Sequence, residues 1–149
     1  MSSRDRASRI SPEAFEQLIH EQMAGHTLDF RVQSLVRQRA ELRLAFDPAF
    51  VRPGGTLSGP TLFTLADLAL YAAVLSEIGL VPLAVTTDMT IHFLRRPPPA
   101  ALVAVATVLK AGRKLVYGHV EIASEATGNL VCHATGTYAV PPASVEGRG

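Results

Sequence analysis

One aspartate stands inside a strongly apolar stretch of this chain of 149 residues. Residues 62–75 are apolar at nearly every position, and Asp67 carries their only charge. Aspartate is a poor residue for a helix interior and is rarely buried unless it is paired or functional. Perturbed carboxylates cluster at functional sites, so Asp67 is the first candidate for chemistry. The structural alternative is that Asp67 lies on a solvated helix edge and bonds a hydroxyl such as that of Thr64 or Tyr71.

The surrounding residues 52–79 predict a helix that carries this aspartate. Turn residues precede a start signal at residues 58–60, where Pro60 suits the first helical turn because it needs no N–H there. A helix that is apolar on every face must be surrounded by protein or lipid. Lipid is disfavoured because the apolar run is shorter than the roughly 20 residues of a spanning helix, and a central aspartate would be costly. We therefore expect a helix enclosed by a sheet, with one carboxylate inside.

Alternating patterns predict strands on both sides of this helix. One or two strands precede it, in residues 31–37 and 39–46, and Phe46 is expected on the same face as Leu44. The strands expected after it cover residues 84–93, 101–110, 115–123 and 130–140. Strict alternation in the first of these places Thr86 on the polar face, opposite Met89 and Ile91.

The order of these elements predicts a single α+β domain, an antiparallel sheet wrapped around one long central helix. We expect it to cover residues 31–140. Residues 1–30 are expected to form an N-terminal tail, frayed over residues 1–10, and a short amphipathic helix that ends near Gly25 and covers the core. Residues 141–149 are expected to form a disordered tail.

Composition limits the classes of function. The net charge of +1 gives no case for binding nucleic acid or an anionic membrane surface. The single cysteine, Cys132, excludes an internal disulfide, and its apolar neighbours favour a core residue over a reactive thiol. The first residues lack the apolar run of a secretory signal, so the expected localisation is cytoplasmic.

Three segments, taken in order, resemble a known family. They are GGTLSGPTLFTLADLALYAAV, VTTDMTIHFLRRP and ATVLKAGRKLVYGHVEIASEATGNLVCHATGTYAV. Together they resemble the hotdog-fold thioesterases of the PaaI-like, 4-hydroxybenzoyl-CoA thioesterase superfamily. The resemblance covers residues 39–140 and implies a hotdog fold, an acyl-CoA thioesterase that hydrolyses a thioester to free acid and CoA, and no cofactor. It also implies a homodimer or a dimer of dimers, which suits a sheet whose edges need protection.

The resemblance also assigns catalytic roles to three positions. In the family, a glycine N–H at the helix N-terminus holds the thioester carbonyl, and a carboxylate eight residues later, from the partner subunit, acts as general base or nucleophile. Gly59 and Asp67 have this spacing. Thr86 matches a hydroxyl that positions the water or the carboxylate. Helix N-termini carry unpaired donors and partial positive charge, which suit a developing oxyanion.

Three neighbouring positions depart from the family pattern. Ser58 stands where the family has histidine, and it can form hydrogen bonds but cannot titrate near neutral pH. Pro60 replaces a second glycine and removes a backbone donor. Arg52 stands near the family's asparagine, where it either binds an anionic part of the substrate or points into solvent.

Basic residues at strand ends are further candidates for binding the phosphates of the substrate, although basic residues in turns are usually just solvated. They are Arg95, Arg96, Arg113 and Lys114. No metal site is expected, because the histidines show no ligand spacing with one another or with Cys132.

Three other functions stay open at this point. The chain could bind acyl-CoA or another acyl ligand without turnover, catalyse another reaction of the same fold, or be a structural subunit. The Asp-x-Asn-Pro-x-His segment of the hydratases that share this fold is absent from the sequence. The carrier is either CoA or an acyl carrier protein.

Overall fold

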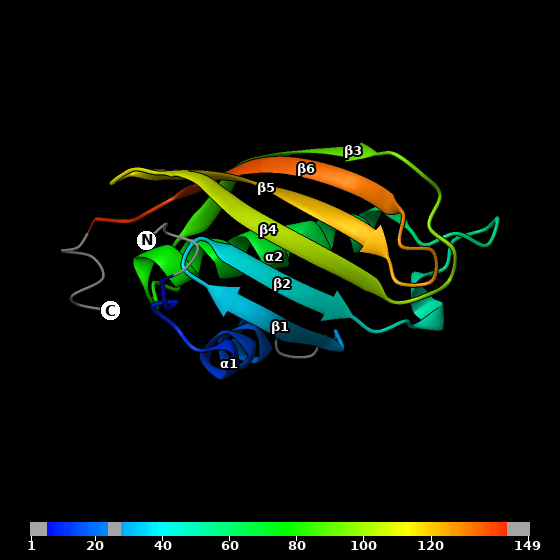
Figure 1. Ribbon diagram of the computed structural model, residues 1–149, viewed down its shortest axis with the longest axis horizontal. Coiled ribbons are helices and arrows are strands. Elements are labelled where there is room, and N and C mark those ends of the chain that lie inside the picture. The colour runs from blue at the N-terminus through cyan, green and yellow to red at the C-terminus, as the bar shows by residue number, and fades with distance from the viewer. Residues whose placement is uncertain (1–5, 24–27, 143–149) are drawn as a thin grey trace.

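The computed structural model describes residues 6–23 and 28–142, and Figure 1 shows a sheet curved around one central helix. The elements, in chain order, are α1 (Pro12–Gln22), β1 (Phe30–Val36), β2 (Arg39–Leu44), the 3-10 helix η2 (Pro48–Phe50), α2 (Gly59–Ile78), β3 (Val85–Phe93), β4 (Leu102–Ala111), β5 (Leu115–Ser124) and β6 (Leu130–Ala139). The 6-stranded sheet has the order β1-β2-β4-β5-β6-β3, and each neighbouring pair is antiparallel. This confirms the predicted α+β hotdog fold.

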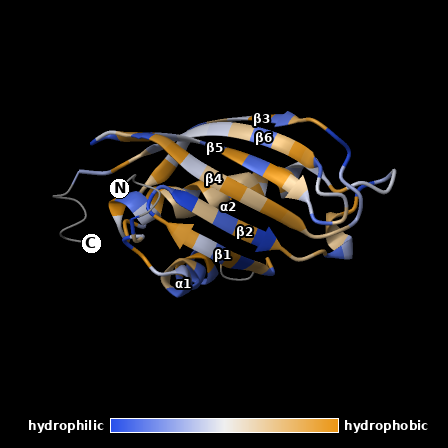
Figure 2. Cartoon of the chain, viewed as in Figure 1, coloured by the Kyte–Doolittle hydropathy of each residue, from blue (hydrophilic) through white to orange (hydrophobic). Residues whose placement is uncertain are grey.

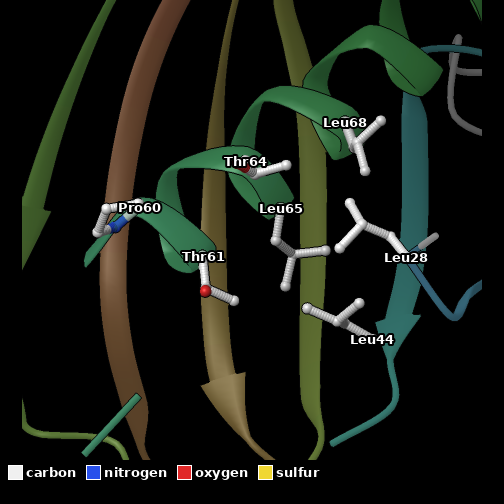
Figure 3. Close-up of a pocket in the computed structure, with 7 residues that line it drawn as sticks. All are labelled: Leu28, Leu44, Pro60, Thr61, Thr64, Leu65 and Leu68. Carbon is white, nitrogen blue, oxygen red and sulfur yellow. The ribbon is translucent and has the colours of Figure 1, made fainter. Parts of the chain in front are cut away.

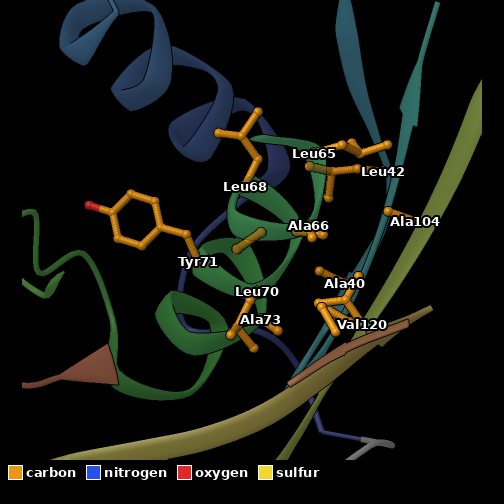
Figure 4. Close-up of a cluster of buried hydrophobic side chains, with 14 of the residues drawn as sticks. Ala40, Leu42, Leu65, Ala66, Leu68, Leu70, Tyr71, Ala73, Ala104 and Val120 are labelled. Carbon is orange, nitrogen blue, oxygen red and sulfur yellow. The ribbon is translucent and has the colours of Figure 1, made fainter. Parts of the chain in front are cut away.

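The central helix α2 begins and ends at the predicted signals. The side-chain oxygen of Ser58 caps its first turn by accepting a hydrogen bond from the Thr61 N–H, and Gly79 ends it with a φ of 93°. Its 20 residues are long and apolar enough to cross a membrane, so the argument from the length of the apolar run was wrong. Twelve of these residues are instead buried inside the domain. Figure 4 shows Leu70 and Ala73 of α2 close to Ala40 of β2 and Val120 of β5.

The N-terminal residues belong to the same core, which corrects the expected boundary at residue 31. Phe15 of α1 is fully buried and packs edge-on against Phe30 and Tyr71, with ring centroids 6.1 and 5.7 Å apart. The expected fraying is wrong for residues 6–10, because Ile10 is buried and the Arg9 N–H donates to the Ser76 carbonyl at 2.9 Å. Helix α1 ends at Gln22 with Met23 as its C-cap, near the expected end. The remaining residues expected to fray, 1–5, and most of the C-terminal tail, 143–149, lie outside the described residues.

Alternation along the strands orders the core. Hydrophobic and hydrophilic residues alternate along β1 and β2 (Figure 2). In β2 the inward residues Ala40, Leu42 and Leu44 are buried, as predicted. The strand ends at Leu44, however, and Phe46 lies outside it with 41% of its surface exposed. The alternation therefore predicted the buried face of β2 correctly, but it placed the end of the strand two residues too late.

A bulge in β3 changes which side chains face the helix. Thr86 pairs with Tyr138 of β6, and the next pair is Asp88 with Thr137, so Thr87 is an extra residue. A bulge of this kind shifts the alternation by one position. Thr86 consequently faces α2 together with Met89 and does not share the polar face that strict alternation predicted.

Candidate active site

The carboxylate of Asp67 accepts two hydrogen bonds on the same oxygen. The Thr86 hydroxyl donates to Asp67 Oδ1 at 2.8 Å, and the Tyr138 hydroxyl donates to it at 2.7 Å. The Tyr138 hydroxyl also lies 3.2 Å from the Asp67 backbone oxygen. Within the part of the chain that the structure describes, no donor bonds Asp67 Oδ2. We call the Thr86 and Tyr138 hydroxyls the hydroxyl pair.

Three elements position this group. Asp67 lies in the first half of α2, on the side that faces the β3–β6 edge of the sheet. The bulge turns Thr86 inward, and the antiparallel register places Thr86 directly opposite Tyr138. Directly opposite side chains on one sheet face are close neighbours, so both hydroxyls can reach the same carboxylate oxygen.

Tyr138 is held by packing as well as by its hydroxyl. Its ring is buried and stacks on Tyr71 with centroids 5.4 Å apart and planes 8° from parallel. Burial, and next the charge of Asp67, raise the pKa of Tyr138 above its ordinary value. The phenol therefore stays protonated and remains a donor to Asp67 across the pH range in which enzymes usually work.

Asp67 lines a pocket of about 520 Å³. The pocket is lined by Ile19, Gln22, Met23, Thr64, Asp67, Leu68, Tyr71, Pro82, Ala84, Val85, Thr86 and Tyr138. No lysine, arginine or histidine is among these described residues. The polar partners of the half-buried carboxylate in this pocket are therefore hydroxyl groups and not cations.

A smaller apolar pocket of about 160 Å³ adjoins this one along α2. Thr64 and Leu68 line both pockets. In Figure 3 the side chains of Leu65 and Leu68 point toward Leu28 and Leu44. The side of α2 next to Asp67 therefore offers apolar volume beyond the carboxylate.

The N-terminus of α2 offers a backbone N–H donor away from the Asp67 carboxylate. Gly59 is the first residue of the helix, and no acceptor bonds its N–H among the described residues. The oxygen of Ser58 accepts from the Thr61 N–H at 3.3 Å and lies 2.8 Å from Thr61 Oγ1, so this side chain acts as a helix cap. Pro60 lines the smaller pocket.

Gly59 and Asp67 cannot act on one carbonyl within a single chain. They are eight residues apart on one helix, which corresponds to about 12 Å along its axis at the usual rise per residue. An oxyanion donor and a base must both lie within about 3 Å of the reacting group. A complete site of the predicted kind requires the Gly59 N–H of a second copy.

The predicted basic residues fall in separate places. Arg52 and Arg96 line one pocket of about 230 Å³. Arg95 donates to the Leu130 carbonyl at 2.7 Å. Arg113 and Lys114 line a pocket with Ile78, at the opposite end of α2 from Gly59. Within one chain, the structure does not bring these last two residues together with Asp67.

Comparison with known proteins decides the family. A model of the thioesterase superfamily matches residues 54–131, more than half of the chain. The chain belongs to this superfamily. Membership supports thioester hydrolysis as the general activity. No significant match was found among curated proteins.

Solved structures of thioesterase superfamily proteins share the fold. A candidate thioesterase from a Silicibacter species is 33% identical, with a TM-score of 0.79, and the match covers 95% of this chain and 97% of that one. The PaaI protein of the E. coli phenylacetic acid degradation operon is 24% identical, with a TM-score of 0.74 and coverage of 88% and 96%. Zebrafish thioesterase superfamily member 2 is 22% identical, with a TM-score of 0.77 and coverage of 89% and 99%. The last two likenesses concern the fold alone.

The sequence analysis did not single out Tyr138. A usable signal was present, because a tyrosine at an inward position of a strand needs a partner for its hydroxyl.

Among the described residues, no group of three or more His, Cys, Asp or Glu side chains could hold a metal ion.

Proposed function

We propose that this protein is an acyl-CoA thioesterase that uses Asp67 as general base. The observation that carries the proposal is a half-buried carboxylate with one oxygen bonded by two hydroxyls, in a pocket lined by apolar groups. Asp67 takes a proton from water while the water oxygen attacks the thioester carbonyl carbon. The carbon–sulfur bond then breaks, and the proton passes to the thiolate, so the products are a free acid and CoA. A base placed in this way contributes about 10²–10⁴-fold to the rate.

The oxyanion of this reaction would be held by the Gly59 N–H of a second copy. The N–H stands at a helix N-terminus without an acceptor among the described residues, where the helix dipole favours negative charge. The chain offers a surface for such a copy, since β3 is one of the two edge strands of the sheet. Val85 and Phe93 on β3 are 56% and 54% exposed, and Phe63 on α2 is exposed as well. A homodimer, or a dimer of dimers, would pair this edge and cover these side chains.

The CoA phosphates would bind beside the loop that precedes α2. Arg52 and Arg96 lie together there, and guanidinium groups are well suited to phosphate. Arg95 is partly committed to the Leu130 carbonyl. We assign Arg113 and Lys114 no part in the same site of one chain, because they lie at the far end of α2.

One observation favours acyl-CoA binding without turnover as the second candidate. Ser58 replaces the family's histidine, and its oxygen is already committed to Thr61. Pro60 removes a donor from the same turn. A site that lacks the histidine and this backbone donor could still bind a thioester in its apolar pocket.

The test is release of free thiol from a panel of acyl-CoAs that varies in chain length and includes aryl thioesters. Asp67→Asn keeps the side-chain shape and removes the base, so kcat should fall at least about a hundredfold. Glu13→Gln, at an exposed carboxylate of α1 away from the β3 edge, is the matched control and should keep the rate of the native chain. Equal hydrolysis by the native and Asp67→Asn proteins would contradict the proposal. Tight binding of a thioester by a native protein that hydrolyses none would favour the second candidate.

A further inference from the structure

Both hydrogen bonds on the Asp67 side chain end at Oδ1. We propose that Tyr138 is a positioning residue which, together with Thr86, fixes Oδ1 so that Oδ2 is the oxygen that takes the proton from water. This inference rests on the proposed thioesterase function and extends it to a residue outside the predicted set. The hydroxyl pair thereby selects the rotamer of the base.

The geometry that fixes Oδ1 is rigid on the Tyr138 side. The ring is 3% exposed and stacked on Tyr71, so the hydroxyl has no room to swing away. It also lies within 3.2 Å of the Asp67 backbone oxygen, which sets the position of β6 relative to α2. On the other side, the bulge in β3 directs Thr86 at the same oxygen. Two strands therefore define one orientation of the carboxylate.

The other polar groups around Asp67 show why hydroxyls position its carboxylate. Tyr71 and Asp67 line the pocket from α2, Tyr138 from β6, Thr86 from β3 and the neutral Gln22 from α1. None of these described groups is a cation. The hydroxyl pair is thus the feature that orients the Asp67 carboxylate.

Tyr138→Phe tests this role because it keeps the stacked ring and removes only the hydroxyl. Without this donor, Oδ1 is held by Thr86 alone, so Oδ2 is aimed less well at the water. The value of kcat should therefore fall about tenfold, with KM changed less than about twofold, because the substrate itself loses no contact.

Thr86 supplies a matched pair of variants for the second hydroxyl. Thr86→Val removes the donor and should lower kcat with little change in KM, as Tyr138→Phe does. Thr86→Ser keeps a hydroxyl and should restore the native kcat. Tyr117→Phe, at a 41% exposed tyrosine of β5, controls for the general effect of losing a phenol and should leave kcat unchanged.

A measurement that does not depend on turnover separates this inference from the proposed function. Carbon-13 NMR of labelled aspartate follows the carboxyl signal of Asp67, assigned with Asp67→Asn, in native protein and in Tyr138→Phe at one pH. A carboxyl signal that moves in Tyr138→Phe supports the role of the hydroxyl pair even if the panel of thioesters is inert. If the signal and kcat both stay in place in folded Tyr138→Phe, the inference is overturned, while a large loss in Asp67→Asn would still support the thioesterase.

Discussion

At the scale of residues, two substitutions separate the role of the Gly59 backbone N–H from the effect of adding a side chain at that position. Gly59→Pro removes the N–H at a first helical position, which proline tolerates, and Ser58 already has the extended conformation that suits a following proline. Gly59→Ala keeps the N–H. In either variant the new Cβ meets the Phe93 ring at about 3.4 Å, so the packing change is shared. We expect kcat to fall about 10²–10³-fold in Gly59→Pro and to stay near the native value in Gly59→Ala.

Thermal unfolding of both variants serves as the control for folding. Similar losses of kcat in Gly59→Pro and Gly59→Ala would assign the effect to contact with Phe93 and would remove Gly59 as the oxyanion donor.

The candidate site was only partly predictable at this scale. Asp67 stands out because a charge within an apolar helix is rare, and Thr86 follows from the family pattern. Tyr138 does not, because alternation places it inward but does not tell which acceptor its hydroxyl reaches. That contact depends on the register of β6 against β3 and on a one-residue bulge. Arg113 and Lys114 were grouped with the substrate on charge alone, and charge carries no information on which end of α2 they occupy.

At the scale of elements, the close approach of β4, β5 and α2 depends on a glycine. A Cβ at Gly118 would lie 2.6 Å from the Thr107 carbonyl oxygen and 2.8 Å from Leu70 Cδ1. Because the first of these atoms is backbone, the strands themselves must move. We expect Gly118→Ala to lower the free energy of unfolding by about 1–3 kcal/mol, measured by chemical denaturation. Gly59→Ala, whose Cβ meets only side-chain atoms of Phe93, is the control and should change it much less. Equal stabilities would show that this contact is relaxed in solution.

The helices and strands were more predictable from the sequence than their end residues and bulges. Sequence pattern and turn residues identified the four strands after α2 and the region of the strands before it, since burial of one face imposes a period of two. Whether that region forms one strand or the two strands β1 and β2 was left open. The end of β2 and the bulge in β3 were missed because both depend on pairing with other strands. The helical spacing of Phe15, Leu18 and Ile19 predicted that α1 covers the core, and all three are buried. The aromatic partners of Phe15 were not predictable, because they lie further along the chain.

At the scale of the whole molecule, the central claim is that one site combines Asp67 of one chain with the Gly59 N–H of another. The direct measurement is thioesterase activity after Asp67→Asn and Gly59→Pro chains are mixed, unfolded and refolded together. In a mixed dimer, one site has both native groups and the other has neither. Random pairing predicts recovery of about a quarter of native activity from two nearly inactive proteins. Activity of the mixture no higher than that of either variant alone, with mixed dimers confirmed by mass spectrometry, would contradict a site shared between chains.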